Sequence, residues 1–515
     1  MCGIIAIYGD KAKEIESNKI DVMLACLEKR GPDKKSYLKE DKIILGQTRL
    51  SIVDIESGHQ PMKDNKHPYT ITFNGEIYRY KDLKKDLENK GHIFSTNSDT
   101  EVILKAYTEY GDRCVEYLDG MFAFAIWNDE KKELFIARDR FGKKPFYYCL
   151  FDKTFFAASE IKAIFSSNLI KGKIDTSSLD DYLRLMYIPP NKTIYSNMYT
   201  LPPAHAGIVK DGDVKKWNYW RLEKKENKIP YDEAKEKIKE LFDEAIKKRM
   251  VADVEIGSLL SGGVDSTLVT LYANKYSSGS IKTFSLGYEG NKSELPYALY
   301  ASKKIETDHY TLNTDRNDIG ELRNIIDYMD EPHADSSDFP QHLISKLASS
   351  KVRVALSGDG ADELFMGYGW YQKYWHIPVY KRLFTNPFSV YKKMVEVFSK
   401  KERERILKKV SGTSDSNNKK ELEISKKSKG YFDQINLTDL SIYLPGQLLT
   451  KVDRTSMMHS LEIRSPFLDT ALVEFVYNLP IEYKLDKNNN KIILKDILTE
   501  TMPKDFVYRR KQGFG

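Results

Sequence analysis

Apolar positions change their pattern near residue 210. Before this point they form short segments bounded by turn-forming residues, at 4–8, 43–45, 69–73, 121–127 and 133–137. Short apolar segments of this kind are typical of β-strands. Two helices are predicted at 14–29 and 100–110, between these strands in the sequence. We therefore expect a strand-rich α+β domain over residues 1–210.

A polar segment with turn-forming residues, 211–230, predicts a linker to a second domain over residues 231–515. In that domain a helix begins near 231, because apolar residues share one face at 234, 238, 241, 242, 245 and 246. Predicted strands at 255–260, 281–286 and 352–356 alternate with helices ending near 276 and 305. This alternation predicts a parallel sheet covered by helices, followed by a mainly helical part from about 375. The polar segment 411–430 predicts a mobile loop.

Composition and charge exclude several classes of protein. The 515 residues are too many for one compact core. The 81 basic and 75 acidic residues give a net charge of +6, and no basic cluster typical of nucleic-acid binding accompanies it. No apolar segment approaches the roughly 20 residues of a membrane span, and no signal peptide is recognisable. We expect a cytoplasmic protein with small-molecule partners, without nucleic acid or membrane. A homodimer is compatible with the sequence, which does not determine the oligomeric state.

The position of one cysteine is chemically informative. Four cysteines occur, at residues 2, 26, 114 and 149, and no C-x-x-C pair indicates a zinc or redox site. Cys2 follows Met1, and its small side chain favours removal of Met1. Cys2 would then carry a thiol and an α-amino group whose pKa is about 7.7–8.0, so that the amine can accept the thiol proton. Position alone is a weak signal, because a cysteine also occurs at residue 2 by chance.

Other residues match the needs of a thiol that attacks a carboxamide. Asn74 and Gly75 follow the predicted strand 69–73 and offer N–H donors to a tetrahedral oxyanion. Arg49 suits the carboxylate of an amino-acid substrate, because a guanidinium group binds carboxylates with two hydrogen bonds. Asp99 suits the substrate ammonium group, but it also stands where it would cap the helix that follows.

Several segments of residues 1–210 closely resemble class II glutamine amidotransferase domains. They begin at Cys2, Arg30, Arg49, Asn74, Asp99, Leu118 and Arg138. The resemblance implies a four-layer αββα N-terminal-nucleophile fold, with Cys2 as nucleophile and base and with Asn74 and Gly75 as catalytic donors. It also implies a glutamine site formed by Arg49, Leu50, Ser51, Ile52, Val53, Asn74, Gly75, Glu76 and Asp99.

Two glycine-rich turns follow predicted strands of the second domain. The first, 261–266, reads Ser-Gly-Gly-Val-Asp-Ser and opens a helix, a combination that lets backbone N–H groups bind an anion. It lacks the lysine of the G-x-x-x-x-G-K-[ST] phosphate loop and is not a dinucleotide turn. Asp265 would repel a phosphate unless a cation such as Mg²⁺ bridged the two.

The second turn, 357–365, contains the carboxylates Asp359, Asp362 and Glu363 within five residues. Carboxylates at such spacing need cations or hydrogen-bond donors in order to stay ionised together. Lys491, much further along the chain, is able to stabilise charge on a departing pyrophosphate. A solvated turn and a surface lysine are the simpler interpretations of these features.

The first turn resembles the PP-loop of ATP pyrophosphatases, and both turns, with the segments 443–445, 451–454 and 461–469, resemble asparagine synthetases. The resemblance implies catalytic roles for Asp359 and Lys491, and a Mg²⁺ ion held by Asp265 and Asp362. Some relatives have Glu at the position of Asp359. It further implies an ATP site formed by Leu260, Ser261, Gly262, Gly263, Asp265, Ser266, Leu286, Ser357 and Gly358.

Together the two resemblances imply an enzyme that amidates aspartate with ammonia from glutamine, through a β-aspartyl-adenylate, and releases AMP and pyrophosphate. The alternative is the same chemistry on another carboxylate, such as a sugar acid or a peptide intermediate. A degenerate homologue without activity is the non-enzymatic alternative. The sequence ends at Gly515, where family members commonly continue, so we expect closing helices of the second domain to be missing from it.

Overall fold

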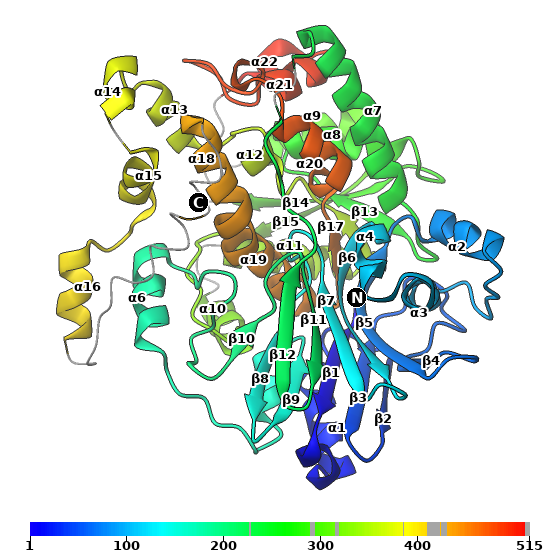
Figure 1. The fold of residues 1–515 in the computed structure, drawn as a ribbon. Coiled ribbons are helices and arrows are strands. Elements are labelled where there is room, and N and C mark those ends of the chain that lie inside the picture. The colour runs from blue at the N-terminus through cyan, green and yellow to red at the C-terminus, as the bar shows by residue number, and fades with distance from the viewer. Residues whose placement is uncertain are drawn as a thin grey trace.

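The structure is a computed structural model, and it describes residues 1–225, 228–288, 294–314, 319–384, 386–408, 423 and 430–509. A strand-rich part lies against a larger part that is mostly helical (Figure 1). Within these described ranges no helix combines the length and the apolar character needed to cross a membrane.

Two antiparallel sheets of six strands form the N-terminal part. The first has the order β10-β8-β9-β1-β3-β2, with strands Tyr199–Thr200, Tyr147–Phe151, Thr154–Ala158, Gly3–Tyr8, Ile43–Arg49 and Lys34–Lys39. The second has the order β12-β11-β7-β6-β5-β4, with strands Asp213–Asn218, His205–Lys210, Glu133–Arg138, Gly120–Asn128, Tyr69–Ile77 and Met62–Lys63. Its helices are η1 (Asp10–Glu14), α1 (Ser17–Ala25), α2 (Tyr80–Asn89), α3 (Asp99–Tyr110), η2 (Gly111–Arg113), α4 (Cys114–Tyr117), α5 (Ile161–Phe165) and α6 (Thr176–Leu185).

The alternation of side chains along β1 shows how these elements are layered. Ile4 and Ala6 pack between the two sheets with residues of β6 and β7. Ile5 and Ile7 point the other way and pack on α1 and α5. The outer face of the second sheet packs on α2 and α3. Successive strand residues face opposite sides, so one buried strand contributes to two cores. The result is four layers in the order αββα, which confirms the predicted fold class of this part.

A five-stranded parallel sheet forms the centre of the second part. Its order is β15-β14-β13-β16-β17, with strands Asp308–Thr314, Lys282–Tyr288, Ile256–Leu259, Val354–Leu356 and Glu462–Arg464. Helices α7 (Tyr231–Arg249) and α8 (Val264–Asn274) pack on one face. Helices α11 (Asp338–Ser349) and α19 (Leu449–Met457) pack on the other. This arrangement confirms the predicted α/β class.

The rest of the second part is helical, as predicted. Its elements are α9 (Leu295–Ile305), α10 (Ile319–Tyr328), α12 (Ala361–Leu364), α13 (Gly369–Trp375), α14 (Val379–Phe384), α15 (Pro387–Val395), α16 (Lys400–Leu407), α18 (Tyr431–Thr438), the π-helix η4 (Asp439–Leu448), η5 (Pro466–Leu468), α20 (Thr470–Tyr477), η6 (Ile481–Tyr483), α21 (Ile492–Leu498) and α22 (Lys504–Val507). The loop predicted at 411–430 lies outside the described residues, apart from Glu423 and Gly430.

Some elements differ from the sequence prediction. The helix predicted at 14–29 is the short η1 followed by α1, which ends at Ala25. Strand β12 occupies 213–218, inside the segment predicted as a linker, because an edge strand with one solvated face keeps many polar residues. Strand β17 was also missed, since two of its three residues are charged and yet fully buried.

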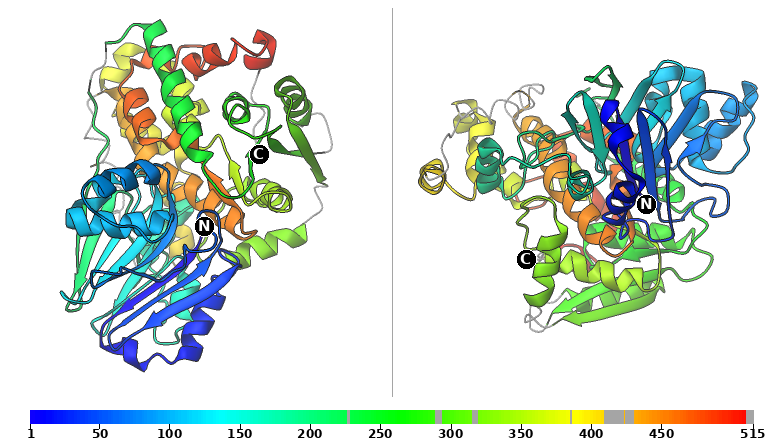
Figure 2. Two further views of the ribbon diagram at one scale, coloured as in Figure 1. Left: turned by 90° about the vertical axis from the view of Figure 1, so that its right-hand side faces the viewer. Right: turned by 90° about the horizontal axis from the view of Figure 1, so that it is seen from below.

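The two parts share a buried interface, and the N-terminal end of the chain lies at it (Figures 1 and 2). Arg30 Nη1 lies 2.8 Å from Asp453 Oδ2 on α19, and both side chains are buried. The amino group of Met1 lies 3.2 Å from Glu462 Oε2 on β17. The interface therefore passes directly beside the start of β1.

Candidate active sites

A cavity of about 30 Å³ opens beside Cys2. It is lined by residues before β1, in β3, in the loop after β3, in β5, at the start of α3 and in β17: Met1, Cys2, Arg49, Leu50, Ile52, Val53, Gly58, Gln60, Phe73, Gly75, Glu76, Ser98, Asp99, Thr100 and Glu462. The fold thus gathers most of the predicted glutamine-site residues around one space. Met1, Gly58, Gln60, Phe73, Ser98, Thr100 and Glu462 were not predicted as site residues; the only signal for Glu462 was its place in the family-like segment 461–469.

Cys2 is held by contacts on both sides of its backbone. Its N–H donates to Asn74 Oδ1 over 3.0 Å, and its carbonyl accepts from Arg30 Nε over 3.2 Å. Burial raises the pKa of the Cys2 thiol, and the nearby N-terminal amine opposes this shift. A thiol in such surroundings reacts as a nucleophile only when an adjacent base removes its proton.

Asn74 contacts Cys2 directly, although it is not among the residues that line the cavity. Its side chain is fully buried, and with Oδ1 on Cys2, its Nδ2 has no hydrogen-bond partner among the described residues. A buried amide N–H without a hydrogen-bond acceptor destabilises the folded protein. An oxyanion beside Nδ2 would accept this hydrogen bond. Gly75 follows with a φ of 157°, and a Cβ there would lie 2.1 Å from Met121 O. Only glycine fits at that point of the strand.

Two carboxylates line the cavity from β5 and α3. Ser98, not Asp99, caps α3, because its side chain accepts from the Thr100 N–H. Asp99 therefore does not cap the helix and lies in the cavity wall, where its Oδ2 accepts from Ile77 N over 3.0 Å. Burial raises the pKa of Asp99 to about 6 and that of Glu76 well above its ordinary value, the latter with a further contribution from Asp99. A bound ammonium group would compensate this negative charge.

Arg49 organises the loop that closes the cavity. Its Nη1 donates to Ile55 O over 3.0 Å, and its Nη2 donates to Val53 O over 3.2 Å and to Asp54 O over 2.7 Å. Ser51 differs from its predicted neighbours, because its N–H donates to Asp33 Oδ2 and the residue does not line the cavity.

The first glycine-rich turn joins β13 to α8. Ser261 Oγ and Ser266 Oγ lie 3.0 Å apart, and Gly263 N donates to Ser261 Oγ over 3.3 Å. Gly262 has a φ of 75°, and a Cβ there would lie 2.6 Å from Ala298 N. The turn is therefore held closely against α9, at the N-terminus of α8 where backbone donors converge. The predicted apolar contacts, Leu260 and Leu286, are buried on the neighbouring strands.

The second turn lies directly beside the first. Its strand, β16, pairs in parallel with β13, so the two turns emerge at the same edge of the sheet. A Cβ on Gly358 would lie 2.9 Å from Asp265 Cβ, which shows how closely the turns approach. Ser357 Oγ donates to Asp359 Oδ2 over 2.6 Å, and burial raises the pKa of the Asp359 carboxyl group.

Lys491 connects these turns and is not a surface residue. Its Nζ lies 2.5 Å from Asp265 Oδ2 and 2.6 Å from Asp362 Oδ1, and the residue is 4% exposed. Asp265 Oδ1 is buried without a hydrogen-bond partner among the described residues. Two convergent carboxylates with an unsatisfied oxygen fit the ligand preference of Mg²⁺. No group of three or more His, Cys, Asp or Glu side chains suited to a metal occurs in the described ranges.

A polar cluster that the sequence did not reveal faces Asp359. Lys451 Nζ lies 2.7 Å from Ser337 Oγ and 3.2 Å from Asp335 Oδ2, and Gln447 Nε2 donates to the same oxygen over 3.1 Å. The positive charge of Lys451 partly opposes the rise in the pKa of Asp359 that burial causes. Lys451 lies in the family-like segment 451–454, which was the only signal for it.

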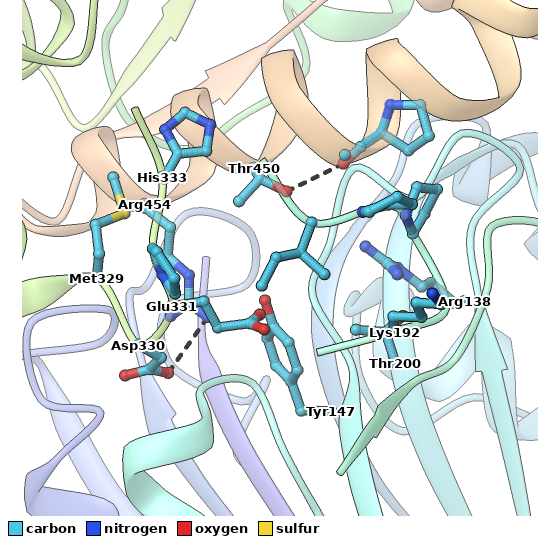
Figure 3. A pocket seen from close by; sticks show the side chains of 16 residues that line it. Arg138, Tyr147, Lys192, Thr200, Met329, Asp330, Glu331, His333, Thr450 and Arg454 are labelled. Atoms are coloured by element: carbon cyan, nitrogen blue, oxygen red, sulfur yellow. Dashed lines mark hydrogen bonds and ion pairs between the residues drawn. The ribbon is translucent and has the colours of Figure 1, made fainter. Parts of the chain in front are cut away.

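A second cavity, of about 50 Å³, lies between the two parts of the chain (Figure 3). Arg138, Tyr147 and Lys192 line it from one side, and Asp330, Glu331, His333, Thr450 and Arg454 from the other. A chain of ion pairs connects the lining residue Arg454 to Cys2. Glu160 Oε1 lies 3.0 Å from Arg454 and 3.1 Å from Arg30, and Arg30 donates to the Cys2 carbonyl. Glu331 accepts from Ile194 N over 2.7 Å, and burial raises its pKa to about 7.

The fold joins a four-layer αββα part with Cys2 at its interface to a parallel-sheet α/β part with two adjacent glycine-rich turns. Comparison with known families agrees. The family described as "Asparagine synthase" matches residues 237–515, and the family described as "Glutamine amidotransferase domain" matches residues 1–220. The chain belongs to the asparagine synthase family, and it is an enzyme of this kind.

Relatives match along the whole chain. "Asparagine synthetase [glutamine-hydrolyzing] 3" of Bacillus subtilis is 32% identical over 546 residues, covering 100% of this chain and 87% of the relative. "Asparagine synthetase [glutamine-hydrolyzing] 1" of the same organism is 30% identical with the same coverage. "Putative asparagine synthetase [glutamine-hydrolyzing] 2" of Methanocaldococcus jannaschii is 37% identical over 400 residues, covering 72% of this chain and 76% of the relative.

Proposed function

We propose that the protein converts aspartate to asparagine with ammonia from glutamine and energy from ATP. The observation that carries this proposal is the pairing, in one chain, of a Cys2 cavity with an unsatisfied Asn74 donor and two abutting turns bridged by Lys491. We assign glutaminase chemistry to residues 1–210, a linker to 211–230 and synthetase chemistry to 231–515. A cytoplasmic location and a homodimer stay predictions from the sequence.

The glutaminase half-reaction uses Cys2 after removal of Met1. The α-amino group takes the thiol proton, and Cys2 Sγ attacks the amide carbon of glutamine. Asn74 Nδ2 and the Gly75 N–H stabilise the oxyanion of the tetrahedral intermediate. Ammonia leaves with the proton held by the amine, and water then hydrolyses the glutamyl thioester to glutamate. Arg49 and Asp99, both in the cavity wall, bind the carboxylate and ammonium groups of glutamine.

The synthetase half-reaction activates a carboxylate. An oxygen of the β-carboxylate of aspartate attacks the α-phosphorus of ATP, pyrophosphate leaves, and β-aspartyl-adenylate forms. The turn at Ser261 holds the phosphates with backbone and hydroxyl donors. Lys491 neutralises charge on the departing pyrophosphate, and Asp359 lies at the turn where the acyl-adenylate forms. Mg²⁺ held by Asp265 and Asp362 would supply further charge neutralisation at the phosphates.

Ammonia has to reach the adenylate without meeting bulk water, where protonation would remove its nucleophilicity. The cavity between the two parts lies at the interface, and the ion-paired side chains of Arg30, Glu160 and Arg454 lie between it and the Cys2 backbone, so an internal route would pass through this region (Figure 3). Ammonia then attacks the acyl carbon of the adenylate, AMP leaves, and asparagine is released.

Pyrophosphate release with a panel of carboxylates tests the acceptor. We expect aspartate, glutamine and ATP with Mg²⁺ to give equal amounts of pyrophosphate, AMP and asparagine. A mass spectrum of the same sample should show Cys2 as the first residue. Pyrophosphate release with a sugar acid or a peptide carboxylate but not with aspartate would favour the alternative acceptor. Release of orthophosphate and ADP would contradict the adenylating chemistry altogether.

Replacement of Asn74 by alanine tests the oxyanion donor. We expect the kcat of glutamine hydrolysis to fall about 10²- to 10³-fold, which is the usual cost of removing one such donor. The KM for glutamine should change little, because the donor acts in the transition state. Ammonia-dependent asparagine synthesis should be kept, and it serves as the folding control. An Asn74→Ala protein with an unchanged kcat would exclude this role.

A further inference from the structure

The parallel sheet contributes one carboxylate to the cavity at Cys2. Glu462 belongs to β17, the edge strand that pairs with β16, and it is fully buried. Among the described residues that line this cavity, it alone comes from beyond residue 220. The glutaminase cavity is therefore closed by a side chain from the other half of the protein.

The two oxygens of Glu462 have different surroundings. Oε1 accepts from Arg464 Nε over 2.7 Å. Oε2 lies 3.2 Å from the Met1 amino group and makes no hydrogen bond with any described residue. The other charged or titratable groups that face Glu462 or the N-terminus are Arg49, Glu76, Tyr78, Asp99, Lys144, Arg464 and the Cys2 thiol. Oε2 is thus directed towards the N-terminal amine.

Removal of Met1 transfers the free amine to Cys2. Consecutive backbone nitrogens are at most about 3.7 Å apart, so the new amine, which now donates to Asn74 Oδ1, lies one residue along the chain from the position beside Glu462 Oε2. A buried carboxylate requires a cation or hydrogen-bond donors nearby. The Met1 amine now fills this role for Oε2. It is lost when Met1 is removed. The Cys2 amine is the group that takes its place.

We propose that Glu462 is a positioning residue of the glutaminase site, the third member of a thiol–amine–carboxylate relay that is completed across the interface. This inference rests on the proposed function. The Cys2 amine takes the thiol proton and becomes an ammonium, which Glu462 stabilises without accepting the proton. The ammonium then returns this proton to the departing nitrogen of glutamine. The carboxylate has the role that aspartate has beside the histidine of a Ser-His-Asp triad.

If Glu462 has this role, glutamine hydrolysis requires the two halves to be packed together. Ser357 N donates to Arg464 O over 3.0 Å, so β17 is bonded to the turn that carries Asp359. Arg464 Nη2 in turn lies 3.3 Å from Glu76 Oε2 in the glutamine cavity. The strand that holds Glu462 is therefore fixed between both sites, and separation of the halves would withdraw the carboxylate from the amine.

The substitution Glu462→Gln, made in the full-length protein, tests the relay, because it keeps the shape and removes the charge. We expect kcat/KM for glutamine hydrolysis to fall about 10²-fold, within the range seen for acid–base groups. A neighbouring carboxylate raises the pKa of an ammonium group. Loss of the carboxylate removes this stabilisation of the ammonium form, so the acid limb of the pH–kcat/KM profile should move to lower pH. Glu462→Asp should recover part of the rate.

Asp469→Asn is the matched control. Asp469 is also buried in the interface region and lies 3.1 Å from both Lys248 and Arg249, but it does not line the glutamine cavity. This variant should leave the acid limb in place, and all variants should keep ammonia-dependent pyrophosphate release. A Glu462→Gln protein with the wild-type acid limb, or with equal losses of both activities, overturns the assignment. A wild-type protein that hydrolyses no glutamine would instead contradict the proposed function.

Discussion

Replacement of Cys2 by alanine is expected to abolish glutamine-dependent synthesis and to leave ammonia-dependent synthesis intact. The thiol is the only group at this position able to form the glutamyl thioester, and nucleophile removal commonly costs at least about 10³-fold. Neither Asn74 nor Asp99 is able to replace it, because an amide is a poor nucleophile and Asp99 already accepts from Ile77 N. Glutamate release and asparagine formation, each measured with glutamine or with ammonium chloride, give the four rates needed.

Alanine is also the appropriate replacement for processing. It is as small as cysteine, so removal of Met1 should proceed equally in both proteins, and a mass spectrum checks this. The wild-type protein with ammonium chloride is the control for folding of the synthetase half. A Cys2→Ala protein that still releases glutamate at more than a few per cent of the wild-type rate would show that another nucleophile exists. Loss of the ammonia-dependent reaction as well would indicate a folding defect at the interface, where Arg30 contacts the Cys2 carbonyl.

Replacement of Lys491 by methionine is expected to lower ATP-dependent pyrophosphate release by about 10²- to 10³-fold, with glutamine hydrolysis at Cys2 preserved. The Lys491 ammonium lies within 2.6 Å of both Asp265 and Asp362, so its removal leaves two adjacent carboxylates with less positive charge between them. That charge would also be missing from the departing pyrophosphate. Most of the loss should appear in kcat, because charge develops in the transition state.

Methionine keeps the unbranched stem of the lysine. The backbone at Lys491 has a φ of 53°, a left-handed conformation that costs lysine and methionine a similar amount, so the substitution isolates the charge. Lys491→Arg is the paired variant, and it should keep part of the activity. Pyrophosphate release by Lys491→Met within about threefold of wild type would exclude a role in pyrophosphate departure. Raising the Mg²⁺ concentration should recover some of the rate if Asp265 and Asp362 bind that ion.

Local patterns in the sequence were sufficient to predict the fold class of each part and the strand ends beside the proposed active sites. Period-two and period-3.6 alternation of apolar residues reports which face of an element is buried, and this information is local. The glycines are visible in the sequence, but the requirement for glycine at Gly75 and Gly262 is tertiary, because a Cβ there would collide with the backbone of Met121 and Ala298. Asn74 and Ser261 were identified as polar residues directly after predicted strands, although β5 in fact continues through Asn74 to Ile77.

Contacts between residues far apart in the sequence could not be predicted from local pattern. Ser51 turns away from the cavity to Asp33, although its neighbours Leu50 and Ile52 line it. The cluster of Asp335, Lys451 and Gln447 forms only when η4 and α19 pack beside the loop before α11. Edge strand β12 was hidden because a half-solvated strand needs few apolar residues.

By itself, the sequence determined the nucleophile candidate at Cys2, the two glycine-rich turns and the order of strands and helices that carries them. The tertiary structure alone decided that Lys491 bridges Asp265 and Asp362 and that Glu462 reaches the N-terminal amine. The physical reason is that burial of a charged residue depends on compensating charges from other elements. Those partners lie more than 100 residues away in this chain, and only tertiary packing brings them together.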